Sequence, residues 1–161
     1  MTVFIRPVVD EDRAALEELA VLAWEPVFVS LRNVLGPSID ALLYPDWRQQ
    51  QREEVRRVCR DRDHTTVLVA EQDATVAGFI AYALDRDRQW GIVDLLAVHP
   101  AHQNRGIGTE LNRVVIDRMR AAGMRIALVE TGGDPGHAPA RRCYENVGYT
   151  LLPIARYFMD L

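Results

Sequence analysis

The sequence predicts a single domain of mixed α/β architecture, and three observations support this prediction. Two β-rich runs, at 65–71 and 75–84, are joined by a polar turn, which predicts an antiparallel hairpin. A third apolar run leads through a glycine-containing loop into a segment with helical periodicity, within 93–122. With the segments before and after these, the predicted element order is β-α-α-β-β-β-α-β-α-β-β, and the sequence contains no internal repeat or low-complexity tract.

Length and composition agree with one ordinary globular domain spanning 1–161, which is long enough to bury a core. Apolar residues make up 48% and charged residues 26%, and no signal peptide or membrane-spanning run is apparent, so a cytoplasmic location without membrane contact is expected. The net charge of -4 argues against nucleic acid as the main partner. Cys59 and Cys143 are far apart and predict free thiols, and the four scattered histidines predict no metal site.

The N-terminal part begins with a predicted strand at 3–7, which Pro7 ends. Asp10 is a suitable cap for the helix that follows. The apolar face of that helix contains Leu16, Leu19, Ala20 and Ala23.

Residues 24–63 predict two or three short helices, with a break at 36–37, where glycine precedes proline. The last of these helices is expected from about 46 to 60. The region is rich in aromatic residues, and core packing is the favoured role for each of them taken singly. The aromatic residues in question are Trp24, Phe28 and Trp47.

The central part of the chain predicts a strand, a loop and a helix. Leu95 to Val98 form an apolar run typical of a buried strand, and Pro100 ends it because proline has no N–H to donate. Gly106 and Gly108 then open the helix, and Gly123 stands where it should stop. The helix has one apolar face, formed by Ile107, Leu111, Val114, Val115, Met119 and Ala122.

This arrangement suits a pyrophosphate group. The first amides of a helix lack intrahelical partners, and glycines let phosphates approach them without a Cβ in the way. Two common phosphate loops are excluded by the residues after Gly108. A P-loop requires lysine where the chain has Thr109, and a dinucleotide fingerprint requires glycine or alanine where the chain has Leu111.

The C-terminal part predicts a strand at 125–131, a glycine-rich loop at 132–136 and a short helix at 138–146. Two further β-rich runs, at 149–152 and 154–160, predict a closing antiparallel pair.

Two motifs resemble those of the GCN5-related N-acetyltransferase (GNAT) superfamily. The first is Gln103-x-x-Gly106-x-Gly108 after a Val-His-Pro strand end. The second, on the last helix, comprises Ala140, Tyr144, Gly148 and Tyr149, with His137 where the family usually has asparagine. The likeness covers most of the chain from Thr65 onward. It implies a mixed, mostly antiparallel sheet of six to seven strands with about four or more helices, splayed between the strands at 93–98 and 125–131.

The resemblance implies acetyl-CoA as co-substrate and no metal. The amides from Asn104 to Thr109 would hold the pyrophosphate, the 96–98 strand would pair with the pantetheine arm, and the Val98 N–H would polarise the thioester carbonyl. The implied cofactor-binding residues are Leu96, Ala97, Val98, Gln103, Asn104, Arg105, Gly106, Ile107, Gly108, Thr109, His137, Ala140 and Tyr144.

The resemblance also assigns catalytic roles. Tyr144 occupies the place of the family's general acid, and the alternative is a half-buried tyrosine with one structural hydrogen bond. Glu130 is the first candidate for the base. Asp94 is the second, because in a regular strand it would lie on the same face as Leu96. A covalent route through Cys143 lacks a paired base and is disfavoured.

The predicted activity is therefore direct transfer of an acetyl group from acetyl-CoA to a primary amine in a ternary complex. The acceptor, which the helices at 24–63 would wall by resemblance, could be a metabolite, an aminoglycoside-like amine or a peptide amine. The alternative function is an inactive acyl-CoA-binding regulatory module, for which His137 and Ile92 are the departures from the family pattern. By analogy, a homodimer formed through 154–161 is possible.

Overall fold

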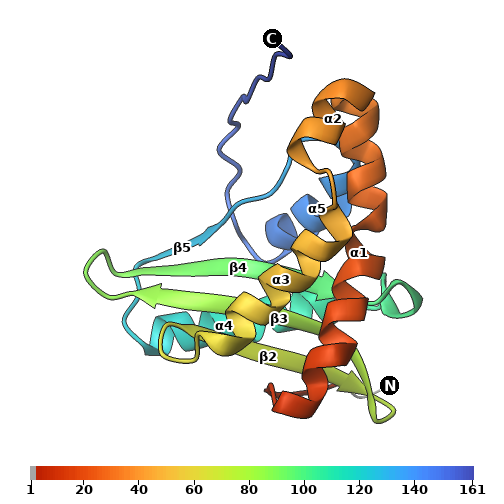
Figure 1. Cartoon of the computed structure of the whole chain (residues 1–161). Helices are drawn as coiled ribbons and strands as arrows, with labels where there is room; N and C mark the ends of the chain where they lie inside the picture. Colours follow the sequence, from red (N-terminus) through yellow and green to blue (C-terminus); the bar gives the residue numbers. More distant parts are fainter. Residues whose placement is uncertain (1–2) are drawn as a thin grey trace.

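The computed structural model describes residues 3–161 and contains one five-stranded sheet with the strands in sequence order (Figure 1). Its strands are β1 (Phe4–Pro7), β2 (Thr65–Gln72), β3 (Thr75–Asp85), β4 (Trp90–Val98) and β5 (Ile126–Val129). The first three pairings are antiparallel, whereas β4 and β5 are parallel. The predicted mixed, mostly antiparallel sheet is confirmed, but it has five strands rather than six or seven.

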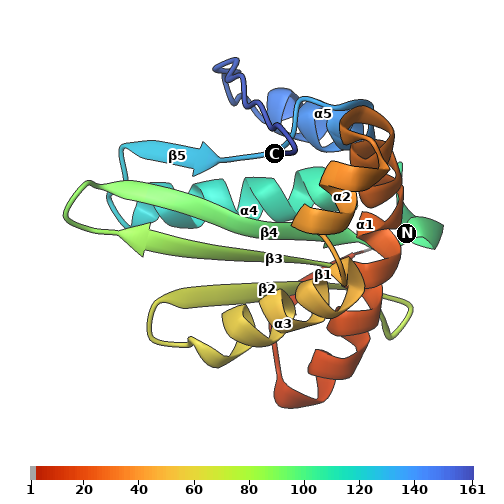
Figure 2. The same ribbon diagram turned by 45° about the horizontal axis from the view of Figure 1, so that its top comes forward.

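The helices cover both faces of this sheet. They are α1 (Arg13–Leu35), α2 (Pro37–Leu43), α3 (Trp47–Arg60), α4 (Ile107–Ala121) and α5 (Ala138–Asn146), with short 3-10 turns η1 (Asp10–Asp12), η2 (Pro100–His102) and η3 (Pro135–His137). Figure 2 shows α3 on one side of the strands and α4 on the other. Two buried clusters result, one under α1 and α3 and one under α4.

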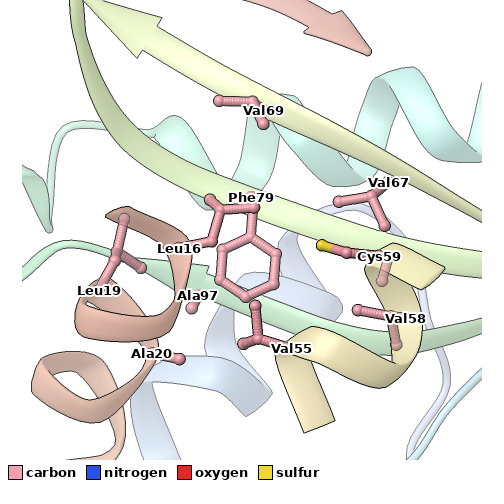
Figure 3. Packing of buried hydrophobic residues seen from close by; sticks show 11 residues of the cluster. Leu16, Leu19, Ala20, Val55, Val58, Cys59, Val67, Val69, Phe79 and Ala97 are labelled. Carbon is pink, nitrogen blue, oxygen red and sulfur yellow. The ribbon is translucent and has the colours of Figure 1, made fainter. Parts of the chain in front are cut away.

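The first cluster surrounds Phe79 of β3, which is completely buried (Figure 3). Side chains of α1, α3 and three strands close around it because each element has its apolar residues on one face. The labelled members are Leu16, Leu19, Ala20, Val55, Val58, Cys59, Val67, Val69 and Ala97.

Helix α1 is longer than the sequence pattern predicts. It continues through Pro26 to Leu35, whereas a division into shorter helices was expected after residue 23. Proline inside a helix removes one hydrogen bond, and here tertiary packing outweighs that loss. Phe28, two residues after Pro26, is buried and stacks on Trp47 at 4.4 Å between ring centroids. The predicted break is confirmed at Gly36, whose φ of 81° ends α1.

The predicted closing pair of strands is wrong. After α5 the described chain forms no helix or strand, and it runs out past α2 as an extended segment (Figure 1). Its large apolar side chains are exposed, among them Leu152, Ile154 and Tyr157. A β-rich sequence becomes a strand only when a sheet edge pairs with it, and this segment has no such partner among residues 3–161.

The predicted splay of the sheet is confirmed. Strand β5 pairs with β4 only from Trp90 to Val93, opposite Ile126 to Val129. The rest of β4, including Leu96 to Val98, pairs with β3 on one side and has no strand on the other. An extended ligand could therefore pair with this free edge.

Candidate active site

The loop between β4 and α4 presents unpaired amides. The first intrahelical bond of α4 is donated by the Glu110 N–H to the Gly106 carbonyl at 2.9 Å, so the amides of Ile107, Gly108 and Thr109 precede it. No side chain caps this end. Gly106 adopts a φ of 83°, and a Cβ there would meet no atom within 4 Å. The backbone of this amide cradle is thus open toward solvent at Gly106, and the partial positive charge of a helix start attracts anionic groups.

The two glycines of this loop have different roles. A Cβ on Gly108 would come within 3.3 Å of Cys143 Sγ on α5, so this glycine allows α4 and α5 to approach each other. Gly108 therefore has a packing role in addition to the phosphate approach expected from the sequence. Ile107 is a core residue, 2% exposed, and only its amide is available to a ligand.

Hydrogen bonds hold the loop against the sheet. Gln103 Nε2 donates to the Val98 carbonyl at 3.0 Å, and the His99 amide donates to the Ala77 carbonyl at 2.8 Å. His102 Nδ1 lies 3.0 Å from Oε1 of the buried Gln72. The two histidines therefore flank the loop, as the sequence indicates. Asn104 and Arg105, at its tip, are exposed.

Tyr144 lies on α5 beside this cradle, since the neighbouring Cys143 packs on Gly108. The residue is 8% exposed, and its ring meets that of Tyr149 edge-on at 5.8 Å. The Tyr144 hydroxyl has no hydrogen-bond partner among the described residues, so the purely structural role considered for it is not seen. Burial raises the pKa of Tyr144, which keeps the phenol protonated at neutral pH.

Asp94 lies where the strand is irregular. Ala81 pairs with Leu95 and Tyr82 with Val93, so Asp94 is the extra residue of a β-bulge. Asp94 Oδ2 accepts a hydrogen bond from Arg57 Nη2 of α3 at 2.8 Å, which raises the pKa of the arginine.

The bulge changes the face of the sheet on which Asp94 lies. Leu96 packs into the cluster under α4, whereas Asp94 reaches toward α3 on the opposite face. The expectation of a shared face with Leu96 is wrong, because it assumed a regular strand. Asp94 is nevertheless 36% exposed, so its carboxylate remains at the surface.

Glu130 follows the last residue of β5 and is exposed. Within residues 3–161 its carboxylate makes no ion pair or hydrogen bond, which leaves it available to a ligand. Glu130 and the free edge of β4 both lie where the two strands separate, since β5 ends at Val129.

His137 and Ala140 lie at the start of α5 and are half-buried. His137 Nδ1 bonds to Oδ1 of Asp134, and Ser30 Oγ of α1 donates to Oδ2 of the same carboxylate at 2.6 Å. Burial alone would raise the pKa of Asp134, but hydrogen bonds from Ser30, His137 and the Gly136 amide outweigh it, so the pKa is lowered. Sequence analysis missed Ser30 and Asp134. The Asp134-to-His137 spacing was a signal for one of them, whereas nothing in the sequence indicated Ser30.

The aromatic residues of the helical region mainly pack against one another. Phe28 stacks on Trp47 and meets Tyr44 edge-on at 5.3 Å, while Trp24 packs against the cluster under α1. Arg48 lies over the Trp47 ring at 4.4 Å. This agrees with the core role favoured for each residue singly.

The described residues contain neither a membrane-spanning helix nor a group of metal ligands. From residue 3 onward no helix has the length and apolar character needed to cross a membrane. Among the same residues no three His, Cys, Asp or Glu side chains are grouped to hold a metal ion.

Comparison with known proteins identifies the family. The family model described as "Acetyltransferase (GNAT) family" matches residues 35–149. A Salmonella typhimurium L-methionine sulfoximine/L-methionine sulfone acetyltransferase is 28% identical over 88 residues, which are 53% of this chain and 50% of that protein. An Azospirillum brasilense IAA acetyltransferase is 38% identical over 65 residues, 40% of this chain and 42% of that one. The matched segment thus spans half or less of each of these relatives.

A solved structure shares the fold and holds the expected co-substrate. The GNAT family acetyltransferase from Brucella melitensis in complex with acetyl-CoA superposes with a TM-score of 0.63 at 24% identity, covering 93% of this chain and 84% of that one. Acetyl-CoA as the co-substrate agrees with the open amide cradle at α4. The match over most of the chain and the splayed sheet lead to one conclusion: the protein belongs to the GNAT family of acetyltransferases.

Proposed function

We propose that this protein transfers an acetyl group from acetyl-CoA directly to a primary amine in a ternary complex. One observation carries the proposal: helix α5, which bears Tyr144, packs against the start of α4, where a Cβ on Gly108 would meet Cys143 Sγ at 3.3 Å, and this supports a single site formed by the cradle and Tyr144. The intact cradle and the unpartnered hydroxyl support an active enzyme over the alternative of an inactive acyl-CoA-binding module. The relatives named above are acetyltransferases, which supports the same choice.

The residues of the chain divide the work of the reaction. The amides from Asn104 to Thr109 bind the pyrophosphate, and the free edge from Leu96 to Val98 pairs with the pantetheine arm. The Val98 N–H stabilises the oxygen that becomes negative, and Tyr144 donates a proton to the departing thiolate.

A carboxylate is proposed to meet the acceptor amine. Glu130 is better suited than Asp94, because the Asp94 carboxylate is engaged by Arg57, whereas Glu130 is free. A negative group at the separation of β4 and β5 attracts a cationic amine and can accept a proton from it.

Calorimetric titration of acetyl-CoA, and separately of CoA, into the protein tests the ligand. We expect micromolar binding, followed by thiol release with members of a panel of primary amines. Hydroxyl analogues of the same acceptors are the matched control for N-acetylation. Absence of binding at millimolar acetyl-CoA would contradict the proposal, and transfer only to the hydroxyl analogues would contradict the choice of acceptor.

The role of Tyr144 has its own test. Tyr144→Phe removes the hydroxyl and keeps the buried ring, so we expect kcat to fall by about 100-fold, with a smaller effect on KM for acetyl-CoA. Tyr149→Phe, which removes the neighbouring hydroxyl, is the comparison. An unchanged kcat in Tyr144→Phe would return this residue to a packing role.

We also propose that the protein forms a homodimer through its C-terminal segment. The large apolar side chains of 151–161 are exposed in a single copy of the chain, and a sheet edge of a second copy would pair with this extended backbone. Analytical ultracentrifugation should give twice the mass of the chain, and removal of 151–161 should give a monomer. A monomeric full-length chain at micromolar concentration would exclude the dimer.

A further inference from the structure

A buried aspartate and a half-buried histidine face each other where β5 joins α5. The Asp134 side chain is 6% exposed and that of His137 is 17% exposed. A carboxylate offers only acceptors, so the Nδ1 bonded to it carries the hydrogen. This leaves the lone pair on Nε2.

The loop is built around this pair. Ser30 Oγ donates to Asp134 Oδ2 and accepts from the Gly136 amide at 2.9 Å, which ties the loop to α1. Arg141 Nη1 of α5 donates to the carbonyls of Gly132 and Asp134, at 2.5 and 2.9 Å. A Cβ on Gly132 would clash with both the Asp134 carboxylate and the His137 ring. The carboxylate is therefore fixed from three directions.

The second ring nitrogen of His137 is free. Nε2 makes no hydrogen bond among the described residues. Four side-chain atoms of the described residues are buried without a hydrogen-bond partner, and His137 Nε2 is not one of them. They are Arg13 Nε, Gln51 Oε1, Asn112 Oδ1 and Tyr149 Oη. An unpartnered nitrogen outside this group has access to solvent, and hence to a substrate.

The position of the Asp134–His137 pair in the fold also agrees with a role at the proposed site. His137 precedes Tyr144 by seven residues, so both lie on one side of α5, two turns apart. The hydrogen bond from Ser30 to Asp134 joins the pair to α1, in the helical region that was expected to wall the acceptor site. Glu130 lies four residues before Asp134 on the same connection.

We propose that His137, in place of Glu130, is the catalytic proton acceptor for the attacking amine, that Asp134 is its positioning residue, and that Glu130 attracts the cationic amine. The inference rests on the proposed N-acetyltransferase function. As the amine nitrogen bonds to the acetyl carbon, a proton passes from that nitrogen to His137 Nε2. The carbon–sulfur bond breaks, and the thiolate takes a proton from the Tyr144 hydroxyl. His137 then releases its proton to solvent and Tyr144 regains one, so the products are the amide and CoA thiol.

Other charged groups near the pair are few. Arg141 of α5 is the cation in direct contact with the loop, and it binds backbone carbonyls rather than the imidazole. From α1 the contacts are Ser30 and Val27, which carry no charge. Ser30 bonds to Asp134 and Gly136, not to His137, so the three side chains do not form a nucleophilic triad.

The test is His137→Asn, which keeps a polar side chain but removes the base. We expect kcat to fall by about 100-fold, the rise of the pH–rate profile from acid pH to disappear, and the Kd for acetyl-CoA to change less than about threefold. Asp134→Asn should lower kcat by about tenfold and shift that rise, because the tautomer is no longer fixed. His64→Asn is the matched control, since His64 also bonds an aspartate three residues earlier but its side chain is 81% exposed, in the turn before β2.

Failures of the two proposals are distinguishable. If the wild-type protein binds no acetyl-CoA, the proposed function fails. If the wild type is active and His137→Asn keeps its kcat and pH profile, the inference is overturned. A variant that raises only the Kd would make His137 a cofactor contact instead, which also overturns it. We expect added imidazole to restore part of the activity of His137→Ala. This recovery would exclude misfolding as the cause of the lost activity, and thermal melting would reveal a misfolded variant.

Discussion

Two pairs of side chains in this protein have the same sequence spacing and opposite surroundings. Asp61 and His64 form an ion pair at 2.7 Å in the turn before β2, with side chains that are 42% and 81% exposed. Asp134 and His137 form the same i,i+3 pair, but their side chains are 6% and 17% exposed. The spacing alone produces the contact, whereas burial and further hydrogen bonds decide whether the contact is rigid.

The difference lies in what surrounds each aspartate. Asp134 receives hydrogen bonds from Ser30 and from the Gly136 amide, whereas Asp61 meets His64 at the surface. Water competes with an exposed pair and side-chain entropy opposes it, so its contribution to stability is small. A buried carboxylate has lost its water, and the protein must replace every hydrogen bond.

The largest expected effect comes from removing the buried carboxylate. Asp134→Ala leaves Ser30 and His137 without their acceptor and removes one of the two acceptors of the Gly136 amide, which should lower the free energy of unfolding by about 3 kcal/mol. Asp61→Ala should change it by less than about 0.5 kcal/mol. Urea unfolding of both variants measures the contrast, and equal losses would show that burial does not distinguish the pairs.

The next largest effect on stability is expected at a glycine of the loop that holds Asp134 and His137. In Gly136→Ala the new Cβ would clash with Ser30 Cβ and approach the Val27 backbone at 3.0 Å, so we expect a loss of about 2 kcal/mol. Gly133→Ala is the control, because a Cβ there meets nothing within 4 Å. The midpoint of thermal unfolding should fall only for the first variant, and a normal midpoint would mean that α1 can withdraw without cost.

Ser30→Ala should have a smaller effect on the same network. It removes one donor to Asp134, but the Gly136 amide keeps its bond to Asp134 Oδ2 at 3.0 Å. A loss of about 1 kcal/mol in urea unfolding is expected. Ser38→Ala, which removes an exposed hydrogen bond to Asp160, is the reference for a serine outside the buried network. If Ser30→Ala destabilised the protein as much as Asp134→Ala does, the hydroxyl rather than the carboxylate would be the centre of the network.

The stability that each pair contributes should also depend on pH, in a different pH range for each pair. The folded pKa of Asp134 is lowered, so the unfolded chain takes up the proton first as the pH falls. Stability from this group is present above the ordinary aspartate pKa of about 4 and is lost as the pH falls through the folded value. Asp134→Asn should remove this acid dependence in urea unfolding measured from neutral to acid pH. A dependence that persists unchanged would assign it to other carboxylates.

The smallest effect concerns His64. Its hydrogen bond to Asp61 raises the pKa of His64, so this pair is favoured below the ordinary histidine pKa and weakens as the pH rises through the folded value. NMR titration should give a midpoint above about 6.5, and Asp61→Asn should lower it. An unchanged midpoint in that variant would show that the bond does not form in solution.

Local rules predicted the elements that need only their own residues. The helix from 46 to 60 follows from its cap, since Asp46 Oδ1 accepts from the Gln49 amide at 3.2 Å. The glycine loop and α4 follow from an apolar run, a proline and a helical face. The splay followed from family resemblance, which carried information that no local pattern contains.

Long-range contacts explain the errors. Pro26 stays inside α1 because Phe28 packs on Trp47, nineteen residues further along. Asp94 faces α3 because of a bulge opposite Ala81 and Tyr82, which a pattern of alternation cannot reveal. The C-terminal runs have the composition of strands, but pairing depends on an edge that the sequence does not specify.

By itself, the sequence determined the family, the proposed phosphate-binding loop and the place of Tyr144 on α5, because these depend on short spacings that fix local backbone geometry. Only the tertiary structure decided the surroundings of His137. Ser30 lies 104 residues from Asp134 in the chain, and folding brings the two side chains to 2.6 Å. Burial then separates a rigid Asp134–His137 pair from the mobile, hydrated contact expected of Asp61 and His64, because replacing water around a carboxylate requires donors from distant segments.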